Sequence, residues 1–160
     1  MVLGVAPALA SCSLGTSNFD AQTNQFYTPA EGVNERSGGV DVLNALVVSD
    51  GDGQGRFIAG LVNNSNTTDD ALTQVQGAGD ASDIKGTLKT PIDLAPNGFV
   101  QLADKGVEPV VLQGDQIVPG RFVELTMTFQ QADPVTVQLP VVAPDDDFKG
   151  VELPSAEASP

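Results

Sequence analysis

The chain has 160 residues, which is about the length of one domain. It has 21 acidic and 7 basic side chains and a formal net charge of −14, so nucleic-acid binding is not expected, because phosphate contacts need a basic surface. It has no histidine, one cysteine and two methionines, which removes the side chains that most metal sites and acid–base catalysts use. Hydrophobic residues make up 41% of the chain and aromatic residues 5%, which predicts one core built mainly from aliphatic side chains.

The first ten residues are apolar and uncharged, and they are too few to span a bilayer, which takes about 20 residues. They are typical of the hydrophobic part of a secretory signal. The pattern of a bacterial lipobox, an aliphatic residue, two small residues and a cysteine, occurs at Leu9, Ala10, Ser11 and Cys12. We therefore expect a signal peptide over residues 1–11.

Lipidation of the Cys12 sulfur would then anchor the protein on the outer face of the cytoplasmic membrane. This role also accounts for a single cysteine, which cannot form a disulfide within the chain. A complete signal has a basic start, whereas the first basic residue here is Arg36. The alternative is an apolar N-terminus that carries an unmodified cysteine.

Residues 12–39 are rich in Ser, Asn, Gln, Thr and Gly and show no sustained periodicity. This composition predicts a flexible, lipid-anchored stalk. Phe19, Phe26 and Tyr27 are the apolar exceptions. They either pack on the edge of the following domain or dock on a membrane-embedded partner.

Residues 40–142 have the pattern of β-strands. A run rich in β-branched residues over 40–48 ends at the turn-forming segment 49–55, and a returning strand is expected over 56–62. Further strands are expected over 71–75, 84–88, 92–94, 99–102 and 110–112.

The clearest hairpin comes last, where apolar and polar residues alternate over 123–129 and again over 135–141. About nine short strands and no convincing helix predict an all-β, antiparallel β-sandwich. Beyond residue 142 the chain is acidic and rich in Pro and Ser, and residues 143–160 are predicted to form a disordered tail.

The order of these features resembles the periplasmic copper chaperone family PCu(A)C. The segment Asn63–Leu72 contains an Asn-rich loop closed by Asp-x-Leu, and Ile92–Gly98 is a short strand with a turn. A Pro-Gly turn at 119–120, a Leu-Thr-x-Thr-Phe strand at 125–129 and a final valine-rich strand complete the pattern. The resemblance covers about two-thirds of the chain, and it implies an immunoglobulin-like or cupredoxin-like sandwich.

The copper ligands of that family are missing here. Copper(I) prefers thioether and thiolate ligands, with imidazole acceptable, and the family has a His-x-Met pair before its Pro-Gly turn. The corresponding stretch is Val107-Glu-Pro-Val110, which has neither residue. Met127 falls on the predicted core face, and Cys12 is expected to be acylated. We therefore expect no cofactor and no metal site, unless a partner lends ligands.

The chain resembles more closely a group of actinobacterial lipoproteins that carry this domain after a lipobox, with a stalk similar to residues 19–34. A related lipoprotein sits on the outer face of the respiratory cytochrome bc–oxidase supercomplex. The resemblance implies a non-catalytic accessory or adaptor protein that binds a membrane protein complex. The acidic chain would favour a partner with a basic face. The alternatives are a divergent copper chaperone or other metal-handling protein of the cell envelope, and an envelope binding module for an unknown ligand.

No enzyme is expected. Serine and threonine are plentiful, but no histidine is present to activate one of them, and nothing in the pattern places a lysine beside a serine. Asp50 and Asp52 are similar to the start of a calcium loop. The twelfth position of such a loop requires Glu and here holds Leu61, so a solvated hairpin turn is favoured.

Overall fold

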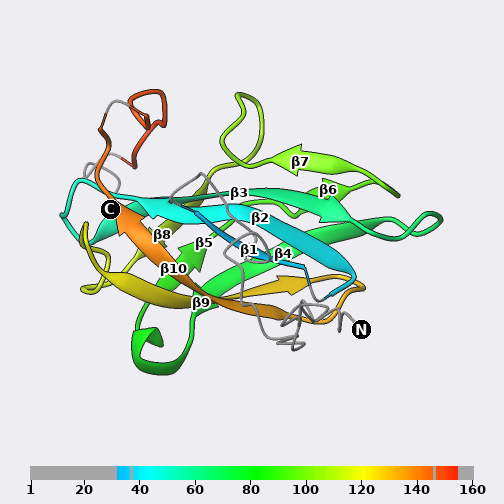
Figure 1. Cartoon of the computed structure of the whole chain (residues 1–160), viewed down its shortest axis with the longest axis horizontal. Coiled ribbons are helices and arrows are strands. Elements are labelled where there is room, and N and C mark those ends of the chain that lie inside the picture. Colours follow the sequence, from blue (N-terminus) through cyan, green and yellow to red (C-terminus); the bar gives the residue numbers. More distant parts are fainter. Residues whose placement is uncertain (1–31, 37, 146, 155–160) are drawn as a thin grey trace, which may run out of the picture.

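The computed structural model describes residues 32–36, 38–145 and 147–154 (Figure 1). In these residues the chain forms ten β-strands and one short 3₁₀ turn, η2 (Gly79–Ala81). The strands are β1 (Val33–Glu35), β2 (Val40–Val48), β3 (Gln54–Asn63), β4 (Asp70–Gly77), β5 (Lys85–Thr87), β6 (Ile92–Leu94), β7 (Phe99–Gln101), β8 (Val110–Gln113), β9 (Phe122–Phe129) and β10 (Val135–Val142). No helix in the described part of the chain is long and apolar enough to cross a membrane.

Seven of the strands form a closed sheet. Their order is β2-β10-β9-β4-β5-β8-β3, and β3 pairs back with β2. β1, β6 and β7 are added to β2, β4 and β3 respectively. The predicted all-β, cupredoxin-like fold is confirmed, with two details that the sequence did not predict. The two sides of the sandwich are joined into a barrel, and one pair, β10 with β2, is parallel.

The predicted antiparallel hairpin near the end of the chain is confirmed. Val135 faces Met127, Val137 faces Leu125 and Leu139 faces Val123, so the apolar residues of β9 and β10 share the inner face. Burial alternates along both strands in step with the sequence. The period-2 pattern therefore predicted that β9 and β10 pair and which face of each strand enters the core.

The barrel interior holds the main core, which consists almost entirely of aliphatic side chains. Its largest fully buried members include Phe57, Leu61, Leu72, Leu112 and Leu125. The small share of aromatic residues in the sequence is thus matched by a core of Leu, Val and Ile.

Part of the predicted stalk belongs to the sheet. β1 pairs antiparallel with β2 at Val33 opposite Ala45 and at Glu35 opposite Val42. Between these pairs β2 bulges at Asn44, whose φ is 50° and whose side-chain oxygen accepts a hydrogen bond from the Gly32 amide. The domain therefore begins before residue 40, because the exposed edge of β2 offers backbone groups for one further strand.

The segment after β10 also differs from the expected disordered tail. It runs back over the outer face of β2 and β3, at the upper left of Figure 1. This outer face carries a second, smaller apolar cluster of three buried side chains, which the C-terminal segment covers together with Val142 and Ala103. The buried members are Leu46, Val48 and Ile58, and the covering residues of the segment are Phe148, Val151 and Leu153. Composition alone predicted a solvated tail because it does not show that three apolar residues meet an apolar strand face.

Truncation of a core side chain gives the first prediction. Leu125→Ala should lower the free energy of unfolding by about 2 to 5 kcal/mol, because Leu125 is fully buried and its removal leaves a cavity. Urea denaturation followed by circular dichroism measures the change. Phe122→Ala in the same strand is the matched control: Phe122 is 63% exposed, so its loss should change the stability little. An equal loss in both variants would contradict the described orientation of β9.

Truncation of the C-terminal segment's aromatic residue gives the second prediction. Phe148→Ala should lower the stability by about 1 to 2 kcal/mol, since the ring is partly buried against the outer cluster. It should also make cleavage within residues 143–154 faster in limited proteolysis. Asp147→Asn, an exposed change one residue earlier, is the control and should leave both quantities unchanged. A Phe148→Ala protein with wild-type stability and cleavage would mean that the segment does not pack.

Candidate functional site

The residues predicted for lipidation and partner docking lie outside the described residues. This applies to the lipobox, to its cysteine and to the three aromatic residues of the stalk: Leu9, Ala10, Ser11, Cys12, Phe19, Phe26 and Tyr27. Lipid attachment at Cys12 and docking by the stalk therefore stay predictions.

The stretch that corresponds to the family's His-x-Met pair is the loop that leads into β8. Val107 is partly buried against the core, Glu108 is half-buried, Pro109 is exposed and Val110 is fully buried at the first position of β8. Glu108 and Val107 line a shallow hollow together with the segment 90–93. The only ionisable side chain in this stretch is a carboxylate, which is a hard ligand and a poor match for Cu(I).

Met127 is fully buried in β9, as the sequence predicted. Its neighbours across the two strand pairs are Val135 in β10 and Val75 in β4. The thioether is therefore part of the packed interior and has no access to a metal ion in solution. Among residues 32–36, 38–145 and 147–154, no group of three His, Cys, Asp or Glu side chains is placed to hold a metal ion.

The segment with Asp50 and Asp52 is a tight turn between β2 and β3, as expected from the sequence. Gly51 and Gly53 have φ values of 96° and 81°, which favour glycine. The Gln54 amide donates to Asp52 Oδ1 at 2.9 Å, so this carboxylate supports its own turn. Both aspartates are exposed to solvent.

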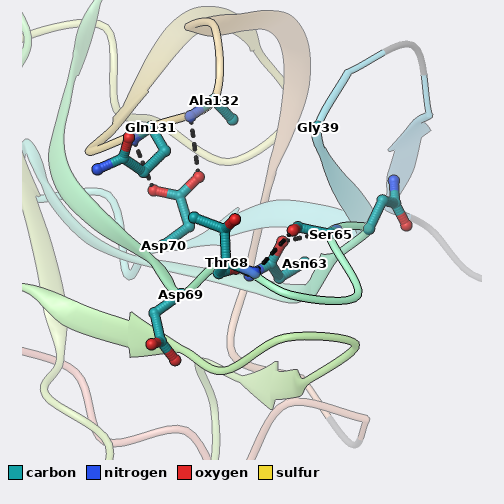
Figure 2. Close-up of a pocket in the computed structure, with 9 residues that line it drawn as sticks. Gly39, Asn63, Ser65, Thr68, Asp69, Asp70, Gln131 and Ala132 are labelled. Atoms are coloured by element: carbon teal, nitrogen blue, oxygen red, sulfur yellow. Dashed lines mark hydrogen bonds between the residues drawn. The ribbon is translucent and has the colours of Figure 1, made fainter.

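A hollow lies beside the loop between β3 and β4 (Figure 2). Its volume is about 420 Å³. Asn63, at the end of β3, is buried and holds the loop in place: its amide nitrogen donates to Thr68 O at 2.8 Å and to Leu94 O at 3.0 Å. Its side-chain oxygen accepts from the Ser65 amide at 2.9 Å. The asparagine therefore ties the loop both to itself and to β6.

Asp70, at the start of β4, holds the other side of the same hollow. The residue is 5% exposed, and Oδ1 accepts from the amides of Ala71 at 2.7 Å and Gln131 at 2.9 Å. Oδ2 accepts from the Ala132 amide at 2.9 Å, as Figure 2 shows. The carboxylate thus caps the turn between β9 and β10. Since three backbone amides occupy its two oxygens, we assign Asp70 a structural role, not a metal-binding or acid–base role.

Sequence reasoning missed one residue of chemical interest, Arg56 in β3. Strand residues on either side of it are apolar, and the sequence placed it simply at the beginning of the returning strand. In the structure it is 6% exposed, and its Nη2 donates to Leu102 O at 3.1 Å. The alternation of β3 could have shown that Arg56 and Phe57 point to opposite faces. It could not show that the outer face is covered.

The fold can be compared with known proteins. No protein-family model and no curated protein matches the chain. Among solved structures, the apo PCuAC domain from PmoF1 is 21% identical, with a TM-score of 0.58, and the match covers 70% of this chain and 100% of that domain. The copper-bound PCuAC domain from PmoF2 is 22% identical, with a TM-score of 0.56, over 70% of this chain and 99% of its own. The apo form of the PmoF2 domain is 23% identical, with a TM-score of 0.55, over 71% and 97%.

The chain therefore has the fold of a PCuAC domain, as its sequence resemblance predicted. The match covers nearly the whole of each neighbouring domain. At identities below a quarter, the similarity shows the fold and does not by itself assign the function.

The Asp70 contacts give the third prediction. Asp70→Ala should lower the free energy of unfolding by about 1 to 3 kcal/mol, because the backbone amides at Gln131 and Ala132 would lose their acceptor in a partly buried place. Urea denaturation provides the measurement. Asp69→Ala, which changes an exposed neighbour of equal charge, should leave the midpoint close to that of the wild type. Equal effects from the two substitutions would mean that charge, and not turn capping, is the role of Asp70.

Proposed function

We propose that the protein is a divergent, non-catalytic copper-chaperone-like domain of the cell envelope that handles metal only in contact with a partner protein. The observation that carries this proposal is the match to complete PCuAC domains, one of them copper-bound, in a chain without histidine. The fold supports a metal-handling role more directly than it supports an adaptor at a respiratory complex, because the names of its neighbours refer to copper and to no such complex.

The chemistry of the available side chains supports the second half of the proposal. A Cu(I) site needs at least two soft donors, and the described residues contain one thioether, which is buried in the core. Soft ligands would therefore have to come from the protein that receives or delivers the ion. We further propose that Cys12 carries the lipid, which would hold the domain at the outer face of the membrane, next to such a partner.

The fourth prediction tests copper binding by the chain alone. In a competition with a chromophoric Cu(I) chelator, the full chain with Cys12→Ser should leave the chelator loaded. Met127 is enclosed by the core, and the one other thioether, Met1, cannot make a Cu(I) site alone. The Met127→Leu, Cys12→Ser protein is the matched control and should give the same titration, since the thioether is enclosed by the core. Stoichiometric transfer of copper to the Cys12→Ser chain would contradict the proposal and would indicate a complete site in the domain itself.

A second candidate function is that of an adaptor without any metal, such as an accessory subunit of the cytochrome bc–oxidase supercomplex. The observation that favours it is that residues 32–36, 38–145 and 147–154 expose no His, Cys or Met side chain although the fold is that of a PCuAC domain. The net charge of −14 would strengthen its encounter with a basic partner, and salt would weaken that encounter.

A pull-down in mild detergent from native membranes separates the two candidates. The tagged chain is compared with its Cys12→Ala variant, and the copper content of the recovered material is measured. A copper protein recovered with the chain, and lost in a high-salt wash, would support the first candidate. Subunits of a respiratory complex recovered at fixed stoichiometry, with no copper retained through the chain, would support the second. Recovery of the chain alone would contradict both.

A further inference from the structure

The outer face of the barrel contains a buried cation, Arg56, that forms no ion pair with another described residue. Arg56 is 6% exposed, and its hydrogen-bond partners among the described residues are two carbonyl oxygens, Leu102 O at 3.1 Å and Glu152 O at 3.4 Å. The third nitrogen, Nε, is buried and has no hydrogen-bond partner. Neutral carbonyls satisfy two N–H groups but leave the positive charge itself without an anion.

Such an arrangement costs free energy, because an ion removed from water loses its hydration energy. A nearby counter-charge is what offsets this loss. The feature is also unusual for arginine, whose planar guanidinium is suited to bind a carboxylate through two parallel N–H groups. The free Nε–H lies on one such edge of the guanidinium.

Arg56 lines a small cavity of about 90 Å³. The other walls come from the loop between β7 and β8, at residues 103–107 and 109, and from the C-terminal segment at Gly150 and Glu152. At about 30 Å³ for each water molecule, the volume equals that of about three waters. It suits a group of a few heavy atoms and excludes a drug-sized ligand.

The charged side chains around the cavity determine which charge of anion it accommodates best. Lys105 adds a second positive charge from an exposed position, and the carboxylates of Asp104 and Glu152 lie on the same rim. Neither carboxylate is hydrogen-bonded to the Arg56 guanidinium. With two cations against two anions, a group of single negative charge is accommodated better than a dianion such as hydrogen phosphate.

We propose that this cavity binds a single carboxylate group, with Arg56 as the buried ligand and Lys105 at the entrance. The carboxylate belongs either to a small free acid or to an acidic side chain of a docked protein, since both present the same planar, singly charged group. Val107 and Pro109 of the stretch 107–110 contribute to the cavity wall, but neither is a ligand in this proposal. Carboxylate binding at Arg56 requires no metal and so does not depend on the metal-handling role. Its occupation would also hold the C-terminal segment, because Arg56 already bonds Glu152 O.

A direct test follows the Arg56 Nε–H by nuclear magnetic resonance in the full, ¹⁵N-labelled chain. Sodium acetate is exchanged for sodium chloride at constant ionic strength, and the resonance is assigned from its loss in Arg56→Lys. We expect the chemical shift of the Arg56 Nε–H resonance to change with acetate concentration and to reach a plateau. The Nε–H resonances of Arg36 and Arg121 should not move. An unmoved Arg56 resonance, or an equal drift of all three, would overturn the proposal. The titration itself uses the wild-type protein, and Arg56→Lys serves only to assign the resonance.

Thermal unfolding supplies a second readout, because a ligand that binds only the folded state raises Tm by mass action. Acetate should raise the Tm of the wild type and of Arg121→Gln, an exposed control, but not that of Arg56→Gln. Lys105→Gln should reduce the rise. Phosphate at equal ionic strength should have a smaller effect on the Arg56 resonance than acetate does. A larger effect of phosphate would overturn the assignment of a carboxylate.

A peptide with capped termini and one Glu, compared with the same peptide carrying Gln, distinguishes the two sources of the carboxylate, a small free acid and an acidic side chain of a docked protein. Binding of the Glu peptide at least tenfold more tightly than acetate would identify an acidic side chain of a protein as the ligand. Equal binding of acetate and the Glu peptide would identify a small free acid. If neither acetate nor the Glu peptide moves the Arg56 resonance, the cavity is not a carboxylate site.

Discussion

The pairing of β2 on both of its sides is the constraint on which the rest of the structure depends. β3 pairs antiparallel with β2 on one side, and β10 pairs parallel with it on the other. Because these two pairings close the sheet, its seven strands have no free edge within the barrel, and one inner face encloses the core. Closure also gives β2 and β3 an outer face, where Leu46, Val48 and Ile58 need a cover. The C-terminal segment provides that cover.

Closure of the barrel leaves its ends to be organised by polar side chains. Asn63 and Asp70 are buried, and both direct their hydrogen bonds to backbone groups of neighbouring loops. A buried backbone amide without an acceptor is costly, so these side chains stabilise loops that strand pairing cannot reach. The Asn-rich loop and the Asp-x-Leu that follows it are therefore explained by architecture. They do not by themselves indicate a site for chemistry.

The described surface consequently combines a PCuAC fold with a donor set unsuited to copper. Carboxylates are numerous, whereas Met127 is enclosed in the core. The proposed function depends on a partner protein, and the net charge of −14 would strengthen an encounter with a basic one. Against this acidic background, the buried Arg56 is a local exception, and its unsatisfied Nε marks a place where a negatively charged group is stabilised.

The sequence by itself determined the all-β class, the inward faces of β9 and β10 and the core position of Met127, because period-2 alternation assigns each residue to a face. It also determined which chemistry is missing, since side chains that are not encoded cannot be supplied by folding. Only the tertiary structure decided the parallel pairing of β10 with β2, the packing of Phe148 on the outer cluster and the burial of Arg56. The reason is physical: each of these depends on contacts between segments far apart in the chain, and no local pattern encodes which distant surface a residue meets.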